Sequence, residues 1–204
     1  MPPASLPNLQ KFTLDELAQF TKEGQFDSRA SKSVALFYAG RDNVHNALKY
    51  VLSRATISIV MNMFGYDDDD LNAVLMEKVR DPSILTVITL DKSQAGGKHE
   101  ASLLAIDKKD LAIFNTHFVI GESATHQISH TKGGVVDGKV AWEGSTNWSS
   151  SGEGTFVVKG NGQAGGPGYK AQNNTNSFII DPSICARFQA ELISEHLTAK
   201  SQAK

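Results

Sequence analysis

The sequence of 204 residues contains one cysteine, Cys185, and no large excess of charge of either sign. A single cysteine excludes a framework of internal disulfides and gives no sign of an oxidising compartment. The formal net charge is −2 at pH 7, so attraction to nucleic acid or an acidic membrane must come from a local patch. No apolar run has the length of a signal peptide core or a membrane span. We therefore expect a soluble protein, cytoplasmic by default, with no visible signal peptide and no transmembrane segment.

The composition is that of a globular protein, with 40% hydrophobic and 21% charged residues. Residues 1–32 are expected to form an N-terminal tail, loose over residues 1–12, and a short helix that starts at the capping box Thr13–Glu16. Residues 33–204 are expected to form one domain, because no second boundary or repeat is visible. The one segment without regular order is the Gly-rich stretch 152–171, which is typical of a long loop.

Strands and helices are expected to alternate in the first half of the domain. Buried strands are predicted over 34–39, 56–63 and 84–90, with helices over 42–54, 70–80 and 100–107, and further strand material over 111–120. This order favours parallel neighbours joined by crossover helices. A hairpin with Asp137-Gly138 as its turn follows, and then a last strand that leads into a helix capped by Asp181-Pro182. The predicted fold class is α/β, an α/β/α sandwich with a mixed central sheet.

Two short motifs carry the chemistry. The stretch from His130 to Asp137 reads His-x-Lys-x4-Asp, and Gly144-Ser145-Thr146-Asn147 follows one strand later. With a two-residue turn, Val136 would pair with Lys139, and His130 would lie opposite Ser145. Because side chains alternate along a strand, His130, Lys132 and Asn147 would then share one surface. Glu143 would also lie there, opposite Lys132, where its charge would repel a phosphate.

The two motifs together resemble the signature of the phospholipase D superfamily, and the resemblance extends over roughly residues 33–198. The chain is most similar to the small bacterial members with a single motif, such as the Nuc-type endonuclease. The resemblance implies a phospholipase D-like catalytic domain, with His130, Lys132 and Asp137 as catalytic residues and Lys132, Ser145 and Asn147 as substrate-binding residues. Neutral imidazole is a competent nucleophile at phosphorus, and Lys132 and Asn147 can stabilise the developing charge without a metal ion or cofactor.

The resemblance also implies a homodimer whose active site lies at the two-fold interface. One His130 would attack the phosphorus while its symmetry mate protonates the leaving group. Asp137 would then orient and support the site. One departure concerns the acidic residue that many family members carry in the last strand to orient the histidine. Residues 173–177 contain no carboxylate, so Asn174 or Asn176 would have to accept the imidazole hydrogen bond.

The expected activity is metal-independent phosphodiester hydrolysis through a phosphohistidine. Nucleic acid, DNA or RNA, is the first choice of substrate, because the short chain and single motif resemble the nuclease branch. The first alternative is a phospholipase D-type hydrolase of phospholipids, in which residues 152–171 could form a lid. The second is a non-catalytic binding module with the same fold, against which the intact motif argues.

Other features favour structural roles. Residues 160–165 match a dinucleotide-binding fingerprint by letter, but Gly166-Pro167-Gly168 follows where a helix is required. The four acids of residues 67–70 indicate a solvated helix start more than an ion site. His126 and His130 lie in an extended stretch without a third ligand, so no metal site is expected. Trp148 could line a substrate groove or pack under the hairpin.

Overall fold

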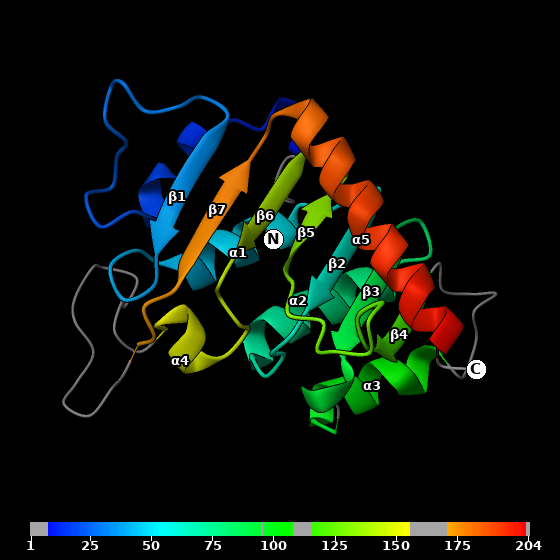
Figure 1. The fold of residues 1–204 in the computed structure, drawn as a ribbon. Coiled ribbons are helices and arrows are strands. Elements are labelled where there is room, and N and C mark those ends of the chain that lie inside the picture. Colours follow the sequence, from blue (N-terminus) through cyan, green and yellow to red (C-terminus); the bar gives the residue numbers. More distant parts are fainter. Residues whose placement is uncertain (1–7, 95, 108–115, 156–170, 203–204) are drawn as a thin grey trace, which may run out of the picture.

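The computed structural model describes residues 8–94, 96–107, 116–155 and 171–202. They form a seven-stranded sheet in the order β1-β7-β6-β5-β2-β3-β4 (Figure 1). The strands are β1 (Val34–Tyr38), β2 (Ser58–Met63), β3 (Leu85–Asp91), β4 (Thr116–Gly121), β5 (Lys132–Val136), β6 (Val140–Gly144) and β7 (Thr175–Ile179). Most of the Gly-rich stretch and the strand material predicted before residue 116 lie outside the described residues.

Helices cover both faces of the mixed sheet, which confirms the predicted α/β/α sandwich. The long helix α5 (Pro182–Gln202) packs on one face against β2, β3, β4 and β5, and α1 (Val44–Ser53) and α2 (Asp69–Val79) lie behind the sheet (Figure 1). Helix α3 (Lys98–Asp107) contacts α2 and β4, and the single turn α4 (Ser150–Glu153) lies between β6 and β7 in the sequence. Three short 3-10 helices are η1 (Leu9–Lys11), η2 (Leu14–Phe20) and η3 (Lys92–Gln94). No helix in the described part of the chain is long and apolar enough to span a membrane.

The main core lies between the sheet and the α1–α2 layer. The predicted apolar stripe of α1 is buried there: Val44, Ala47, Leu48, Val51 and Leu52. Leu9 and Phe12 belong to the same core, so residues 8–12 are not the loose tail that we expected. Burial of these two apolar side chains offsets the conformational entropy that residues 8–12 lose on ordering. The capping box is present, since the Glu16 carboxylate accepts a hydrogen bond from Thr13 N, but it opens a 3-10 helix.

The first predicted strand, β1, does not lie beside β2 as a parallel neighbour, although the sequence favoured that arrangement. β2, β3 and β4 are parallel neighbours as predicted, whereas β1 lies at the sheet edge and pairs antiparallel with β7. The hairpin β5–β6 and β7 come between β1 and β2, although they follow much later in the sequence. β1 is consequently half-buried, with Val34, Leu36 and Tyr38 exposed on one face.

The hairpin turn forms as predicted, but the strand register is shifted by one residue. Asp137 and Gly138 have φ of 54° and 64°, and Lys139 N donates to Val136 O at 2.9 Å. Lys139 belongs to the turn and has no partner in the opposite strand. Val136 therefore pairs with Val140, and Glu143 pairs with Gly133. A shift by one residue moves a side chain to the other face of a sheet. The exposed Glu143 therefore does not lie opposite Lys132, and the expected repulsion of a phosphate is absent from this pairing.

Candidate functional site

The predicted nucleophile, His130, lies two residues before β5, at the end of the sheet where β2 finishes. Its side chain is exposed, and its ring meets the Phe64 ring edge-on, with 4.7 Å between centroids. Phe64 follows β2 directly, and its N–H donates to Thr131 O at 3.0 Å. The end of β2 thus fixes the backbone beside His130 and leaves the imidazole accessible.

Lys132 is the first residue of β5 and is only 4% exposed. Its ammonium donates to His130 O at 2.8 Å and lies 4.9 Å from the centroid of the Phe64 ring. Burial lowers the pKa of Lys132, although the negative charge of Asp91 acts in the opposite direction. Among the described residues, no carboxylate forms an ion pair with this ammonium. A buried cation with one carbonyl and a ring as partners retains donors for an anion.

The side chain of Asn147 packs closely against Gly65, the residue that follows Phe64. A Cβ atom on Gly65 would lie 2.9 Å from Cγ of Asn147, so only glycine permits this approach. Trp148 N donates to Gly65 O at 2.9 Å, which holds the Asn147 segment against the end of β2. Within the described part of the chain, Oδ1 of Asn147 is buried without a hydrogen-bond partner. Phe64-Gly65 is therefore the shared support of His130, Lys132 and Asn147.

Ser145 is less directly part of this group. Its hydroxyl accepts a hydrogen bond from Thr175 N at 3.0 Å, and its own N–H donates to Thr175 O at 2.9 Å. These bonds join the end of β6 to the start of β7. The predicted pairing of Ser145 with His130 does not form, because the ladder is shifted and its last pair is Gly133 with Glu143.

Asp137 lies at the opposite end of β5 from Lys132 and is buried. Its carboxylate accepts hydrogen bonds from the N–H groups of Thr56, Ile57 and Ser58 and from the Thr56 hydroxyl, at 2.8–3.2 Å. A strand rises about 3.3 Å per residue, which puts the turn beyond reach of the atoms around His130. The structure thus places Asp137 where it anchors the hairpin to the start of β2.

The side of His130 that faces α5 is acidic. A cavity of about 280 Å³ there is lined by His130, Ile128 and three carboxylates, those of Glu122, Glu191 and Glu195. Glu195 accepts hydrogen bonds from Thr131 Oγ1 at 3.3 Å and from Asn62. This cavity can accommodate a cationic group beside the predicted nucleophile.

The amides expected to orient His130 are bonded elsewhere. Asn174 Nδ2 donates to Gly152 O at 2.9 Å and to Gln172 Oε1 at 3.1 Å. Asn176 is buried, and its Nδ2 lies 3.5 Å from Ser177 O. Neither side chain makes a hydrogen bond to the imidazole among the described residues, because β7 is separated from β5 by β6.

Trp148 packs under the hairpin rather than lining a groove. It is fully buried, with its ring centroid 5.4 Å from that of Tyr66 and 6.3 Å from that of Trp142. An isolated bridge between Tyr66 and Trp148 reinforces this packing.

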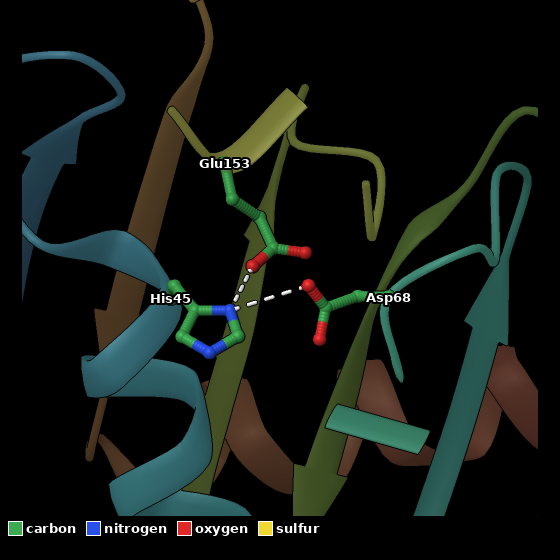
Figure 2. A group of neighbouring side chains, drawn as sticks. All are labelled: His45, Asp68 and Glu153. Atoms are coloured by element: carbon green, nitrogen blue, oxygen red, sulfur yellow. Dashed lines mark hydrogen bonds and ion pairs between the residues drawn. The ribbon is translucent and has the colours of Figure 1, made fainter. Parts of the chain in front are cut away.

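A second polar group, which the sequence analysis missed, is formed by residues of three helices and their caps. His45, Asp68 and Glu153 are all buried, and their ligand-type atoms lie within 4.8 Å of one another (Figure 2). Asp68 is one of the four acids at the start of α2, and it does cap that helix, with Oδ1 accepting from Leu71 N at 2.7 Å. Asp68 is nevertheless buried against His45 rather than solvated. No spacing signal exists for these residues, because they come from three separate segments.

The pKa values of Glu153 and His45 are both raised in this group. Burial, together with the charge of Asp68, raises the pKa of Glu153 to about 7, although its hydrogen bond with His45 opposes the shift. Burial alone would lower the pKa of His45, but the hydrogen bond and charge of Glu153 outweigh it and raise this pKa. Each group therefore holds its proton to a higher pH than it would in water.

A histidine, a buried lysine and an asparagine near the end of central strands in an α/β/α fold are suited to phosphodiester chemistry, and the family match below assigns the chain to a class of phosphodiesterases. The chain belongs to the phospholipase D-like family: residues 48–194 match the family model described as cardiolipin synthase, PLD-like domain. A comparison with curated protein sequences finds no significant match.

Solved structures share the fold at low sequence identity. NucT from Helicobacter pylori is similar with a TM-score of 0.60 and 17% identity, over 81% of this chain and 96% of that one. Nuc from Salmonella typhimurium, a phospholipase D family member, has a TM-score of 0.58 and 16% identity, over 82% and 95%. Phosphatidylserine synthase from Haemophilus influenzae has a TM-score of 0.56 and 11% identity, over 84% of this chain but 42% of that one.

Proposed function

We propose that this protein is a nuclease that hydrolyses DNA or RNA phosphodiesters through a phosphohistidine on His130, without a metal ion in the reaction. The observation that carries the proposal is the Lys132 ammonium, which is buried without an ion pair to a carboxylate among the described residues and donates to the backbone of the exposed His130. A phosphate would supply the anion that Lys132 lacks. The same phosphate would lie within reach of His130 and Asn147 across the Phe64-Gly65 support.

The reaction takes two displacements. In the first, a ring nitrogen of His130 forms a bond to phosphorus, the bond from phosphorus to the leaving oxygen breaks, and that oxygen takes a proton from a general acid. In the second, water attacks the phosphohistidine, the phosphorus–nitrogen bond breaks, and the former acid removes a proton from the water. Lys132 and Asn147 bind the non-bridging oxygens, where negative charge grows in both transition states.

The general acid is proposed to be His130 of a second copy of the chain. An isologous dimer places equivalent residues on either side of its two-fold axis, so two exposed imidazoles near the axis would face one phosphate. Ile128, two residues before His130, is 51% exposed, and an apolar side chain there suits a contact between copies. Asp137 remains in a supporting role, as its distance from His130 requires.

The similar structures favour nucleic acid as the substrate class. Both Nuc-type structures are matched over nearly their whole length. A third similar structure, with a TM-score of 0.52 and 14% identity over 85% of this chain and 55% of that one, is an archaeal chromatin protein with a novel mode of DNA binding. The proposed surface for the phosphate chain is the sheet edge around Lys132.

A phospholipase activity is the second candidate, and the acidic cavity favours it. The three carboxylates near His130 could hold a cationic headgroup such as choline or ethanolamine while His130 attacks the adjacent phosphorus. The family model and the phosphatidylserine synthase structure also concern lipid chemistry by name.

One experiment separates these candidates. The protein is incubated, with excess chelator, with plasmid DNA, single-stranded RNA and vesicles of phosphatidylcholine and phosphatidylglycerol. We expect nucleic acid cleavage that is lost in His130→Ala and kept in His126→Ala, an exposed histidine of the same loop. Hydrolysis of vesicles alone would replace the nuclease by the phospholipase. Binding of DNA with no cleavage of any substrate would leave only a binding module.

The intermediate can be tested directly. A substrate labelled at phosphorus should transfer an acid-labile, alkali-stable label to the wild-type protein and to His126→Ala, but not to His130→Ala. A label on any other residue would overturn the mechanism.

A further inference from the structure

The buried group of His45, Asp68 and Glu153 joins three parts of the chain that are far apart in sequence. His45 lies in the first turn of α1, Asp68 caps α2, and Glu153 ends α4 (Figure 2). The three residues are 5%, 7% and 1% exposed, respectively. Figure 2 shows both carboxylates directed at the same edge of the imidazole.

The two carboxylates of this group have too few hydrogen-bond donors between them. Nδ1 of His45 lies 2.5 Å from Oε2 of Glu153 and 3.5 Å from Oδ2 of Asp68. A single proton on Nδ1 can serve only one of these two carboxylates fully. Oε1 of Glu153 is buried and has no hydrogen-bond partner within the described ranges. Two carboxylates thus converge on one imidazole nitrogen where burial excludes bulk water, and such an arrangement is costly unless a cation neutralises it.

The other ring nitrogen of His45 faces a third carboxylate. Nε2 lies 3.6 Å from Oδ2 of Asp70, within ion-pair range but beyond the length of a hydrogen bond. A metal-ligating histidine commonly donates its second N–H to a carboxylate, which fixes the tautomer and leaves the first nitrogen free to bind. Here that arrangement would direct the lone pair of Nδ1 toward Asp68 and Glu153.

We propose that His45 Nδ1, Asp68 and Glu153 bind one divalent transition-metal ion, such as Zn²⁺ or Mn²⁺. Ligands at about 2.0–2.1 Å in a tetrahedron lie about 3.3 Å from one another. Asp68 already lies close to this separation from Nδ1, and Glu153 needs to move away by somewhat less than 1 Å. With a neutral imidazole and two carboxylates, a divalent ion makes the group electrically neutral. One nitrogen and two oxygens suit Zn²⁺ or Mn²⁺ better than Mg²⁺, which favours oxygen ligands and retains water.

The ion has a structural role in this proposal. It would connect α1 and the start of α2 to α4, the turn that follows the segment with Asn147. Glu153 N donates to Ser149 O at 2.9 Å, and Ser149 N donates to Asn147 O at 2.9 Å, so the backbone between Asn147 and the ion site is short and internally bonded. No step of the proposed phosphodiester chemistry passes through the ion.

The test uses the full chain, stripped of metal by chelator and dialysed. Zn²⁺, Mn²⁺ and Mg²⁺ are titrated separately, with calorimetry for stoichiometry and circular dichroism for the unfolding temperature. We expect about one Zn²⁺ or Mn²⁺ per chain and a higher unfolding temperature when it binds, with a much weaker response to Mg²⁺. Because no substrate is present, the outcome is separate from that of the nuclease assay.

Three variants localise the ion. Glu153→Gln and His45→Gln remove a ligand at similar size, and Asp68→Asn keeps the oxygen that caps α2. Each folded variant should lose at least tenfold in affinity. The control is Glu122→Gln, which alters an exposed pair in which His126 Nδ1 lies 3.4 Å from Glu122, and it should bind like the wild type. If the wild type binds no more ion than the three variants do, the proposal is wrong. The short contact between His45 and Glu153 would then be explained by a shared proton.

Discussion

Replacement of Asp137 should destabilise the protein without removing a reacting group. In Asp137→Ala, the N–H groups of Thr56, Ile57 and Ser58 and the Thr56 hydroxyl lose their acceptor. Water can reach Thr56 and Ile57, which are exposed, but not the buried Ser58. An unsatisfied buried donor costs about 1–3 kcal/mol, and alanine at φ of 54° adds about 1 kcal/mol of strain. The expected loss is about 3 kcal/mol, which lowers the unfolding temperature of a chain of this size by roughly 6–12 °C.

The assay separates the structural role of Asp137 from a role in the chemistry. Urea unfolding followed by circular dichroism gives the free energy of unfolding, and turnover is measured at a temperature where each variant is folded. We expect turnover per folded molecule to stay within a few-fold of the wild type. Asp27→Ala, which alters an exposed carboxylate that bonds its near neighbour Arg29, serves as the control and should leave the urea midpoint unchanged. An unchanged midpoint with lost turnover in Asp137→Ala would mean that the carboxylate takes part in the chemistry.

Three further predictions concern the site and the buried group. If two copies share one active site, activity in mixtures of wild type and His130→Ala, after subunit exchange, should fall with the square of the wild-type fraction; a linear fall would indicate independent sites. If Lys132 and its symmetry mate bind nucleic acid phosphates, binding should weaken by roughly one log unit per log unit of salt for each phosphate neutralised, and a flat salt dependence would contradict this. In the metal-free protein, the pKa of Glu153 is raised from 4.5 to about 7 on folding, so its stabilising contribution is fully present below pH 4.5 and is lost as the pH rises through about 7. His45 acts in the same direction, because its pKa is also raised in the folded state. The free energy of unfolding should therefore fall by about 3 kcal/mol between pH 4 and pH 8 at this group, and Glu153→Gln should flatten the profile in urea titrations.

Local sequence patterns predicted the parts of the fold that local interactions determine. The apolar stripe of α1, the Asp137-Gly138 turn and the cap of α5 all depend on residues within one or two turns of each other. His130 and Lys132, which are only two residues apart, also stay close together whatever the topology. The phospholipase D-like fold followed from these elements together with the two motifs.

Long-range pairing could not be predicted in the same way. The place of β1 depends on β7, which lies about 140 residues later, and no pattern within Val34–Tyr38 records that partner. The extra residue Lys139 shifts the hairpin register by one, although an Asp-Gly turn is compatible with either register. That single residue decides whether Glu143 faces Lys132 or the α5 side.

The buried group was missed for a physical reason that also connects it to the candidate site. Spacing signals arise when ligands share one helix or hairpin, whereas His45, Asp68 and Glu153 meet only after α1, α2 and α4 have packed. Two short segments, 64–68 and 147–153, carry site residues at their start and members of the buried group at their end.

These two segments are bonded to each other between the two groups. Trp148 N donates to Gly65 O at 2.9 Å, and Asp67 N donates to Trp148 O at 2.6 Å. Trp148 itself is fully buried between Tyr66 and Trp142, so it has little freedom to move. A displacement of either carboxylate in the buried group therefore has to be absorbed within the few residues that also position Phe64 and Asn147. Because the proposed reaction needs the amide of Asn147 aligned with Lys132, the charge state of the buried group should affect the geometry of the phosphate site through these backbone bonds, even though no side chain of that group reaches the phosphate.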